Sequence, residues 1–249
     1  MKVFAMLALA SALAVPAAFS QNSGLQQEVQ KALHGSQFKD VQVAVDNNGI
    51  VTLSGTVDIY QAKVNAERKA RHVAGNGAIR DEIQVAGPEL SDQQLQEKVA
   101  KAINYGLIGY VPVAFQAITV QAHNGAVLLG GHAAGPIAAS DALAIAENVK
   151  GVKDLVDNIQ VDPLSPMDDR IRMAEFRAVY SSPFLSQYAI DPEKPIRIQV
   201  VNGHVTLYGV VDSEAQKNAA GIKANSVPGV FSVTNDIEVA GAPAEKPQK

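Results

Sequence analysis

Hydrophobic and polar residues alternate in three short stretches of the chain, which predicts three half-buried β-strands. The stretches are residues 41–45, 117–121 and 196–200. An Asn-Gly pair follows each stretch, and the three pairs are Asn48-Gly49, Asn124-Gly125 and Asn202-Gly203. Asn-Gly is favoured where both central residues of a two-residue hairpin take a positive φ. The sequence therefore predicts the same β-hairpin three times.

The three hairpins begin a longer repeat. In each copy, a second glycine stands six positions after the hairpin glycine, and a third glycine stands 26 positions after it. An isoleucine stands 34 positions after the hairpin glycine and begins the sequence Ile-Gln-Val or Ile-Glu-Val. In chain order, the second glycines are Gly55, Gly131 and Gly209, the third are Gly75, Gly151 and Gly229, and the isoleucines are Ile83, Ile159 and Ile237. No insertion interrupts this window, so the chain is predicted to contain three copies of one module.

A helix is predicted between the second and third glycines of every copy. Alanines four positions apart share one helix face, and a face of small residues lets a helix lie close to a sheet. These alanine pairs are Ala66 and Ala70, Ala142 and Ala146, and Ala220 and Ala224. Asp58 and Asp212 are predicted to cap two of these helices. The middle copy has Ala134 followed by Gly135-Pro136, which predicts a different helix start there.

A second helix is predicted before each hairpin. The first covers about residues 25–33, where Ser23 and Gln26 form a capping-box pattern, and the second covers about 92–104, with Ser91 and Gln94 in the same pattern. The third begins at Ser165-Pro166, because proline suits the first position of a helix. Its apolar residues Ile171, Ala174 and Ala178 are expected to share a face.

These elements predict an α+β fold of three tandem αββαβ modules. Each module is expected to be a two-layer α/β sandwich, with two helices on a small three-stranded sheet. The predicted boundaries are residues 22–87, 89–163 and 164–240. Residues 241–249 contain two prolines and are expected to form a disordered tail.

The first 20 residues are predicted to be a secretory signal peptide. Lys2 precedes an apolar run that ends in small residues, with Ser20 at the expected cleavage site. A retained N-terminal anchor is the alternative. The chain has no cysteine, which excludes disulfides and a lipoprotein anchor. We therefore expect an exported, periplasmic protein that is peripheral to membranes rather than transmembrane.

No residue pattern indicates catalysis, a cofactor or a metal site. The five histidines, at positions 34, 72, 123, 132 and 204, stand apart from one another and lack the spacing of metal ligands. A Gly-x-Ser-x-Gly motif and a glycine-lysine phosphate loop are both absent from the sequence. The basic Gly-x-x-Gly loop of a KH-like nucleic-acid-binding domain is absent too. We therefore expect neither an enzyme nor a nucleic-acid-binding protein.

The repeat resembles the BON domain (bacterial OsmY and nodulation). The resemblance is carried by the hairpin glycine, a strand that ends in glycine, an alanine-rich helix, Val-x-Gly-Val and a final Ile-x-Val; residues 227–230 and 235–239 match best. In the first copy Gly75-Asn76-Gly77 replaces the expected glycine-valine. The resemblance implies a non-enzymatic, often stress-linked protein of the bacterial envelope that binds phospholipid surfaces or protein partners. It assigns no particular residue to binding.

The copies differ most between the first helix and the first strand. This part carries additional aromatic residues in the second and third copies, and loops carry function more often than scaffolds do. The candidate lipid- or partner-binding residues are Arg170, Arg172, Phe176, Arg177, Tyr180, Phe184 and Tyr188, with Tyr105 and Tyr110 in the second copy. Aromatic rings and arginines together suit a membrane interface. The alternative is that aromatic residues at helical spacing fill the core.

Formal charge does not single out one copy as strongly basic. Residues 21–90 carry a net charge of −1, residues 91–163 of −3 and residues 164–240 of −2. A local basic cluster occurs at residues 68–72. The sequence thus favours a periplasmic envelope protein that binds phospholipid headgroups. The alternative is a protein–protein scaffold or chaperone-like stress protein, which could form oligomers.

Overall fold

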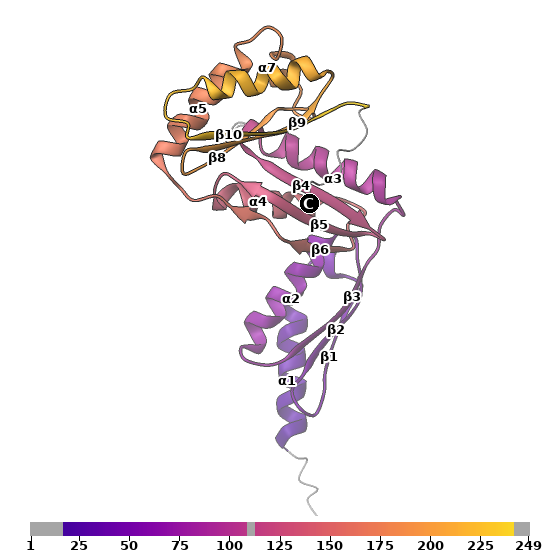
Figure 1. Cartoon of the computed structure of the whole chain (residues 1–249). Coiled ribbons are helices and arrows are strands. Elements are labelled where there is room, and N and C mark those ends of the chain that lie inside the picture. The colour runs from indigo at the N-terminus through magenta and orange to yellow at the C-terminus, as the bar shows by residue number, and fades with distance from the viewer. Residues whose placement is uncertain (1–16, 109–112, 242–249) are drawn as a thin grey trace, which may run out of the picture. The chain divides into compact units, whose positions relative to one another are not determined.

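The computed structural model describes residues 17–108 and 113–241. These described residues divide into two compact units, one within residues 17–58 and 62–85 and the other within residues 59–61 and 86–241. Helices and strands alternate in both units (Figure 1). Residues 1–16 of the predicted signal peptide and residues 242–249 of the predicted tail lie outside the described residues, whereas residues 17–20 are helical.

The first module has two helices and a three-stranded sheet. Its elements are α1 (Ala17–Ala32), the short 3-10 helix η1 (Ser36–Phe38), β1 (Val41–Val45), β2 (Val51–Val57), α2 (Tyr60–Ala74) and β3 (Ile79–Val85). The strand order is β1-β2-β3. Strands β1 and β2 are antiparallel, whereas β2 and β3 are parallel because α2 connects them as a crossover.

The second module repeats this topology with an interrupted last strand. Its elements are α3 (Asp92–Gly106), η2 (Val113–Phe115), β4 (Ala117–His123), β5 (Ala126–Ala133), α4 (Pro136–Glu147), β6 (Asp154–Asp157) and β7 (Gln160–Val161). Strand β5 pairs with β4 in antiparallel fashion and with both β6 and β7 in parallel. Segments β6 and β7 together therefore occupy the position of a third strand.

The third module has the same strand order and a longer connection after its first helix. Its elements are α5 (Pro166–Tyr180), α6 (Gln187–Ile190), β8 (Arg197–Val201), β9 (His204–Val211), α7 (Glu214–Asn225) and β10 (Ser232–Val239). The sheet order is β10-β9-β8, with β9 parallel to β10 and antiparallel to β8. The predicted α+β fold of three tandem αββαβ modules is thus confirmed.

Two of the three predicted Asn-Gly turns have the expected geometry. Both central residues have positive φ, at 51° and 85° for Asn124-Gly125 and at 52° and 77° for Asn202-Gly203. The prediction of the same turn in the first module is wrong. There the hairpin closes on Val45 and Val51, and the side chain of Asp46 accepts hydrogen bonds from the backbone of the five-residue loop. This Asp side chain replaces the tight turn.

The second glycine of each repeat is required by close contact with the backbone. Gly55, Gly131 and Gly209 have φ of 107°, 76° and 132°. A Cβ atom at Gly55 would lie 2.0 Å from the carbonyl oxygen of Asp40, and one at Gly131 would lie 2.1 Å from that of Ala117. Only glycine fits both this φ and this spacing without a shift of the backbone.

Helix starts confirm some of the predicted caps and correct others. Ser91 and Gln94 form the expected capping box at α3, and Ser165 accepts a hydrogen bond from the backbone of α5. The cap at Ser23 is wrong because α1 begins at Ala17 and runs through it. Asp212 does not cap α7; the neighbouring Ser213 does. Helix α4 begins differently, as expected, with Gly135 before Pro136.

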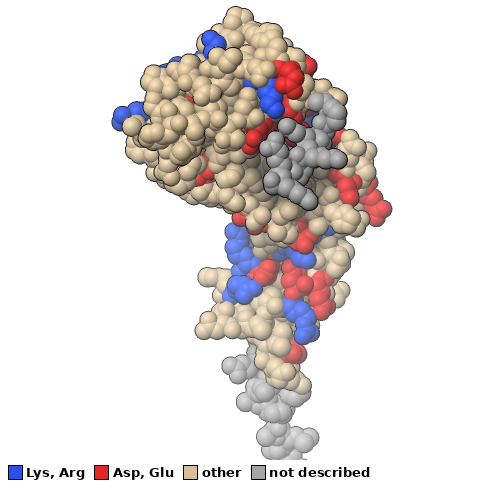
Figure 2. All heavy atoms as spheres, in the orientation of Figure 1, with Lys and Arg blue, Asp and Glu red and all other residues tan. Residues whose placement is uncertain are grey.

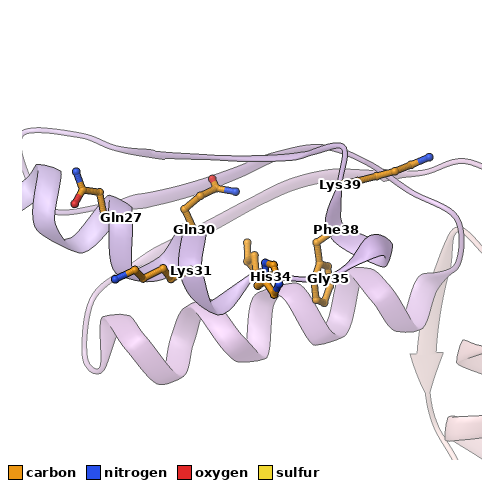
Figure 3. A pocket seen from close by; sticks show the side chains of 8 residues that line it. Gln27, Gln30, Lys31, His34, Gly35, Phe38 and Lys39 are labelled. Carbon is orange, nitrogen blue, oxygen red and sulfur yellow. The ribbon is translucent and has the colours of Figure 1, made fainter.

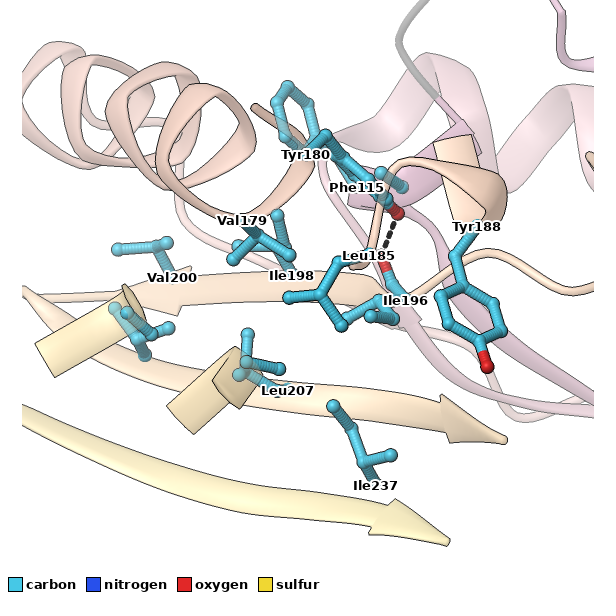
Figure 4. Packing of buried hydrophobic residues seen from close by; sticks show 14 of the residues in the cluster. Phe115, Val179, Tyr180, Leu185, Tyr188, Ile196, Ile198, Val200, Leu207 and Ile237 are labelled. Atoms are coloured by element: carbon cyan, nitrogen blue, oxygen red, sulfur yellow. Dashed lines mark hydrogen bonds between the residues drawn. The ribbon is translucent and has the colours of Figure 1, made fainter. Parts of the chain in front are cut away.

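Small residues bring the second helix of each module against its sheet. The six alanines that define this helix face are fully buried, as predicted. The core of the third module extends beyond its own elements, because Ala114 and Phe115 of η2 belong to the same cluster of buried residues. Figure 4 shows Phe115 beside Tyr180 in this cluster. Modules 2 and 3 therefore share a hydrophobic core.

Candidate functional site

A shallow groove lies at the end of α1 in the first module. It has a volume of about 570 Å³, and its lining includes Lys31, His34, Phe38 and Lys39. Phe38, the last residue of η1, is buried, whereas the two lysines and His34 are exposed. In Figure 3, Lys31 and Lys39 extend to opposite sides of His34 and Phe38. The groove therefore has an apolar floor and cationic ends.

A second groove of about 420 Å³ lies beside α2 and is also basic. Arg68, Lys69 and His72 line it together with Ala32 of α1. Lys69 connects the two grooves, since its ammonium group donates a hydrogen bond of 3.3 Å to the carbonyl of Ala32 and lies 5.9 Å from the ring centre of Phe38. We call the cationic and imidazole side chains that line both grooves the basic face: Lys31, His34, Lys39, Arg68, Lys69 and His72.

The basic face is narrow and lies among mixed charges. Arg71 pairs with Glu67 on α2, and Lys39 lies 3.8 Å from Asp40. Figure 2 likewise shows acidic side chains beside Lys and Arg over this part of the chain. Such an arrangement does not form a large positive surface, but it places several cations along two grooves. This arrangement suits contacts with separate small anionic groups.

Several predicted site residues of the third module are inside the fold. Arg172, Tyr180 and Tyr188 are 2%, 8% and 5% exposed. Tyr180 donates a hydrogen bond to the carbonyl of Ile196, and Tyr188 donates one to Gln216. Burial raises the pKa of the Tyr180 phenol well above its usual range. The prediction that these three side chains face a membrane is therefore corrected, because they pack and bond within the module.

The other predicted site residues of the third module are half-buried or exposed. Phe176 is half-buried, with its ring centre 6.0 Å from that of Phe115 and 4.8 Å from that of Tyr180. Arg170, Arg177 and Phe184 are exposed. The aromatic row predicted from its spacing is thus mainly packing, and only Phe184 of that row extends into solvent.

In the second module, Tyr105 is partly exposed and in contact with the third module. Its hydroxyl lies 3.3 Å from the carboxylate of Glu193, which also forms an ion pair of 2.6 Å with Lys101. The exposed fraction of Tyr105 is 48%. Tyr110 lies outside the described residues. Tyr105 therefore helps to join modules 2 and 3.

A buried polar contact strengthens the connection between modules 2 and 3. The guanidinium of Arg197 in β8 donates hydrogen bonds to the Asn104 side chain and to the backbone carbonyl of Gln116. Burial lowers the pKa of this guanidinium. Gln199 donates a hydrogen bond of 2.9 Å to Asp162, which also lies 3.1 Å from His132. These groups are used to hold two modules together.

Within the described residues, no group of three or more His, Cys, Asp or Glu side chains is arranged to hold a metal ion. His123 lies 3.2 Å from Asp92 at an exposed position, and His132 contacts Asp162 at the contact between modules. Each of these histidines thus has a structural explanation. The described helices also include none that is long and apolar enough to span a membrane.

The sequence only partly indicated the basic face. The cluster at residues 68–72 was visible, but Lys31, His34 and Lys39 are about 30 to 40 positions away and belong to other elements. Lys69 bonding to Ala32 brings the two segments together. A clearer signal existed for the buried face of α5, where Ile171, Glu175 and Val179 recur every four residues. Ala174 and Ala178, which were expected on this face, are only half-buried.

The fold and the threefold repeat define a class of protein. The BON-domain family matches residues 21–87, 91–163 and 184–241. These matches cover most of the chain, so the chain belongs to the BON-domain family and contains three such domains. Helix α5 precedes the third matched segment, although it packs on that module's sheet and on α7.

A known protein resembles the chain over most of its length. The chain is 24% identical to osmotically-inducible protein Y of Escherichia coli (strain K12) over 194 residues, which is 76% of this chain and 92% of that protein. The relationship is distant. Two solved structures of CdsD, a structural protein of the type III secretion system of Chlamydia trachomatis, cover 89% and 87% of the chain and 94% and 96% of their own. Their identities are 16% and 15%, and each TM-score is 0.24, which supports no inference about this chain.

Proposed function

We propose that this chain is a non-enzymatic protein of the bacterial periplasm that binds anionic phospholipid surfaces peripherally. The basic face of module 1 is the observation that supports this proposal. The groove at the end of α1 combines exposed cations with the apolar floor formed by Phe38, and the groove beside α2 adds Arg68 and Lys69. Lipid headgroups present phosphate above a hydrocarbon layer, so cations beside an apolar floor are complementary to them.

The proposed location rests on the predicted signal peptide and on the family. The similarity to osmotically-inducible protein Y suggests a role under osmotic stress. The proposed site differs from the region of α5 that the sequence favoured, because the structure buries Arg172, Tyr180 and Tyr188. Arg170, Arg177 and Phe184 are exposed and remain available for a secondary contact.

Vesicle flotation tests the proposal. The chain from Gln21 onward is mixed at low salt with phosphatidylethanolamine vesicles that do or do not contain phosphatidylglycerol. We expect flotation with the anionic vesicles only. The double variant Lys31→Gln, Arg68→Gln should weaken binding about thirtyfold, because each cation near an anionic surface contributes about 1 kcal/mol.

A matched variant controls for overall charge. Lys194→Gln, Lys223→Gln removes the same charge from exposed positions of the third module. This variant should bind nearly as well as the unaltered chain. Equal losses in both variants would remove the basic face as the site, and no flotation of the unaltered chain would overturn the lipid proposal. A defined oligomer in light scattering without lipid would then favour the scaffold function.

A further inference from the structure

Helix α5 places a carboxyl group in the core of the third module. Glu175 is 0% exposed. Both of its carboxylate oxygens are buried and lack a hydrogen-bond partner in the described residues. Burying an ionised carboxylate without a partner is very unfavourable, whereas a neutral carboxyl group is tolerated far better. The folded module therefore favours the protonated form of Glu175.

The rest of the α5 face is held to the sheet by polar side chains with partners. Near its start, Asp168 accepts hydrogen bonds of 2.9 and 2.8 Å from the backbone of Asn202 and Gly203. One turn later, Arg172 donates to the carbonyl of Val200. At its end, Tyr180 donates to the carbonyl of Ile196, as Figure 4 shows. Glu175 lies between these attachments and has none of its own.

Neighbouring charges do not provide an ionised Glu175 with a partner. On α5 the nearby titratable groups are Asp168, Asp169, Arg172, Arg177 and Tyr180. The terminal nitrogens of Arg172 bond to Asp169 and Val200, whereas its Nε is buried without a hydrogen-bond partner among the described residues and does not bond to Glu175. The elements packed on α5 contribute Arg197 from β8, His204 beside the hairpin, and Glu214, Lys217 and Lys223 from α7. Arg197 bonds across to module 2, and the others are exposed or half-buried. Burial alone raises the pKa of Glu175, to about 8.

We propose that Glu175 is a proton-dependent latch that holds α5 on the sheet of the third module. When the carboxyl group is protonated, α5 lies closed over β8. When the proton leaves, the carboxylate favours water, and the helix opens more often. Opening exposes apolar residues of α5 such as Ile171 and Val179, which are buried in the closed state.

The direction of the pH effect follows from proton binding. In the open state Glu175 has its ordinary pKa of 4.5, and in the closed state its pKa is about 8. Between these values the closed state binds the additional proton, so rising pH favours opening. The contribution of Glu175 to closure is complete below about pH 4.5 and is lost as pH rises to about 8. The opening constant should increase about tenfold per pH unit within this window and level off above it.

Hydrogen exchange of the whole chain measures the opening directly. Amides of α5 are followed from pH 5.5 to 9, with the intrinsic pH dependence of exchange removed and the amides of α3 used as an internal reference. We expect protection of α5 to fall about tenfold per pH unit up to about pH 8 while α3 changes little. Glu175→Gln keeps the shape but cannot ionise, so its α5 protection should not depend on pH.

Two further measurements keep the test decisive. If Glu175→Gln fails to fold, Glu175→Leu takes its place, and carboxyl carbon NMR of the unaltered chain reports the titration of Glu175 itself. A Glu175 that titrates near its ordinary pKa would overturn the proposal. So would equal pH dependence in Glu175→Gln, or an ionised Glu175 that pairs with Arg172 while α5 stays protected.

Discussion

Modules 1 and 3 have the same topology but differ in the space beside their first helices. In module 1 the connection after α1 is short. One open groove lies beside Phe38, and a second lies beside α2. In module 3 the corresponding connection is longer and buries Leu185 and Tyr188 in the core. The distance from the first helix to the hairpin glycine is 24 positions in module 1, from Leu25 to Gly49. It is 32 positions in module 3, from Ile171 to Gly203.

This difference shows that connections of different length on one scaffold leave a groove in module 1 and enlarge the core in module 3. A short connection leaves cations of α1 and α2 around a groove, and a longer one adds side chains that extend the core. Loops tolerate such changes of length because each additional residue adds little to the entropy of closing the loop. The repeated strands and glycines, by contrast, cannot vary in this way without disturbing the sheet.

The largest effect is expected from changing the shared scaffold. Gly55→Ala should lower the free energy of unfolding of module 1 by about 4 kcal/mol, because the new Cβ would lie 2.0 Å from the carbonyl oxygen of Asp40. Gly209→Ala should affect module 3 less, since the corresponding distance to Pro195 is 2.7 Å. Urea unfolding followed by hydrogen exchange in each module measures both effects.

Gly49→Ala is the matched control for this prediction. Gly49 also has a positive φ, of 78°, but no atom lies within 4 Å of the position that a Cβ would take. This variant should cost only about 1 kcal/mol from the backbone conformation. Equal losses in Gly49→Ala and Gly55→Ala would show that contact with the backbone of Asp40 is not what requires glycine.

A smaller loss of stability should follow from truncating a buried side chain in the longer connection of module 3. Leu185 is fully buried, so Leu185→Ala should lower the free energy of unfolding by about 3 kcal/mol through lost burial and a residual cavity. The neighbouring Phe184 is 50% exposed, and Phe184→Ala should change stability by less than about 1 kcal/mol. Chemical denaturation compares the two, and similar losses would contradict the assignment of Leu185 to the core.

The smallest effect should come from removing one hydroxyl. Tyr188 donates a hydrogen bond of 3.0 Å to Gln216 and accepts one of 2.9 Å from the backbone of Asp212. Tyr188→Phe should therefore cost about 1 kcal/mol, because Asp212 retains a second bond to Gln216. Thermal unfolding at constant pH measures this change. An unchanged transition would mean that Gln216 alone holds the segment.

The repeat made the scaffold predictable. Glycines at equal spacing predicted the positions of the hairpins and of the strands in each sheet. Alanines four positions apart predicted which helix face packs on the sheet. The first turn was predicted wrongly because Asp46, which closes it with its side chain, lies outside the aligned Asn-Gly pair. The cap at Ser23 failed because a capping pattern does not show whether the helix continues upstream.

The candidate site was harder to predict, because side-chain positions depend on contacts between distant segments. Aromatic residues at helical spacing fit a membrane surface and a core equally well, and only burial of Tyr180 and Tyr188 distinguishes these cases. Lys31 and Arg68 are 37 positions apart, so their grooves depend on how α1 meets α2. Glu175 lies four residues from both Ile171 and Val179, so the spacing places it on the buried face of α5. Because Glu175 is acidic, the pattern of apolar residues did not indicate that it is buried.

The core that η2 shares with module 3 determines how these domains can be recombined. Ala114 and Phe115 are encoded with the second domain, yet their side chains are buried in the core of the third. A gene fusion that separates the two domains at their linker would deprive this core of two side chains and leave the Arg197 contacts without Asn104 and Gln116. We therefore expect the second and third domains to be inherited and transplanted as a pair.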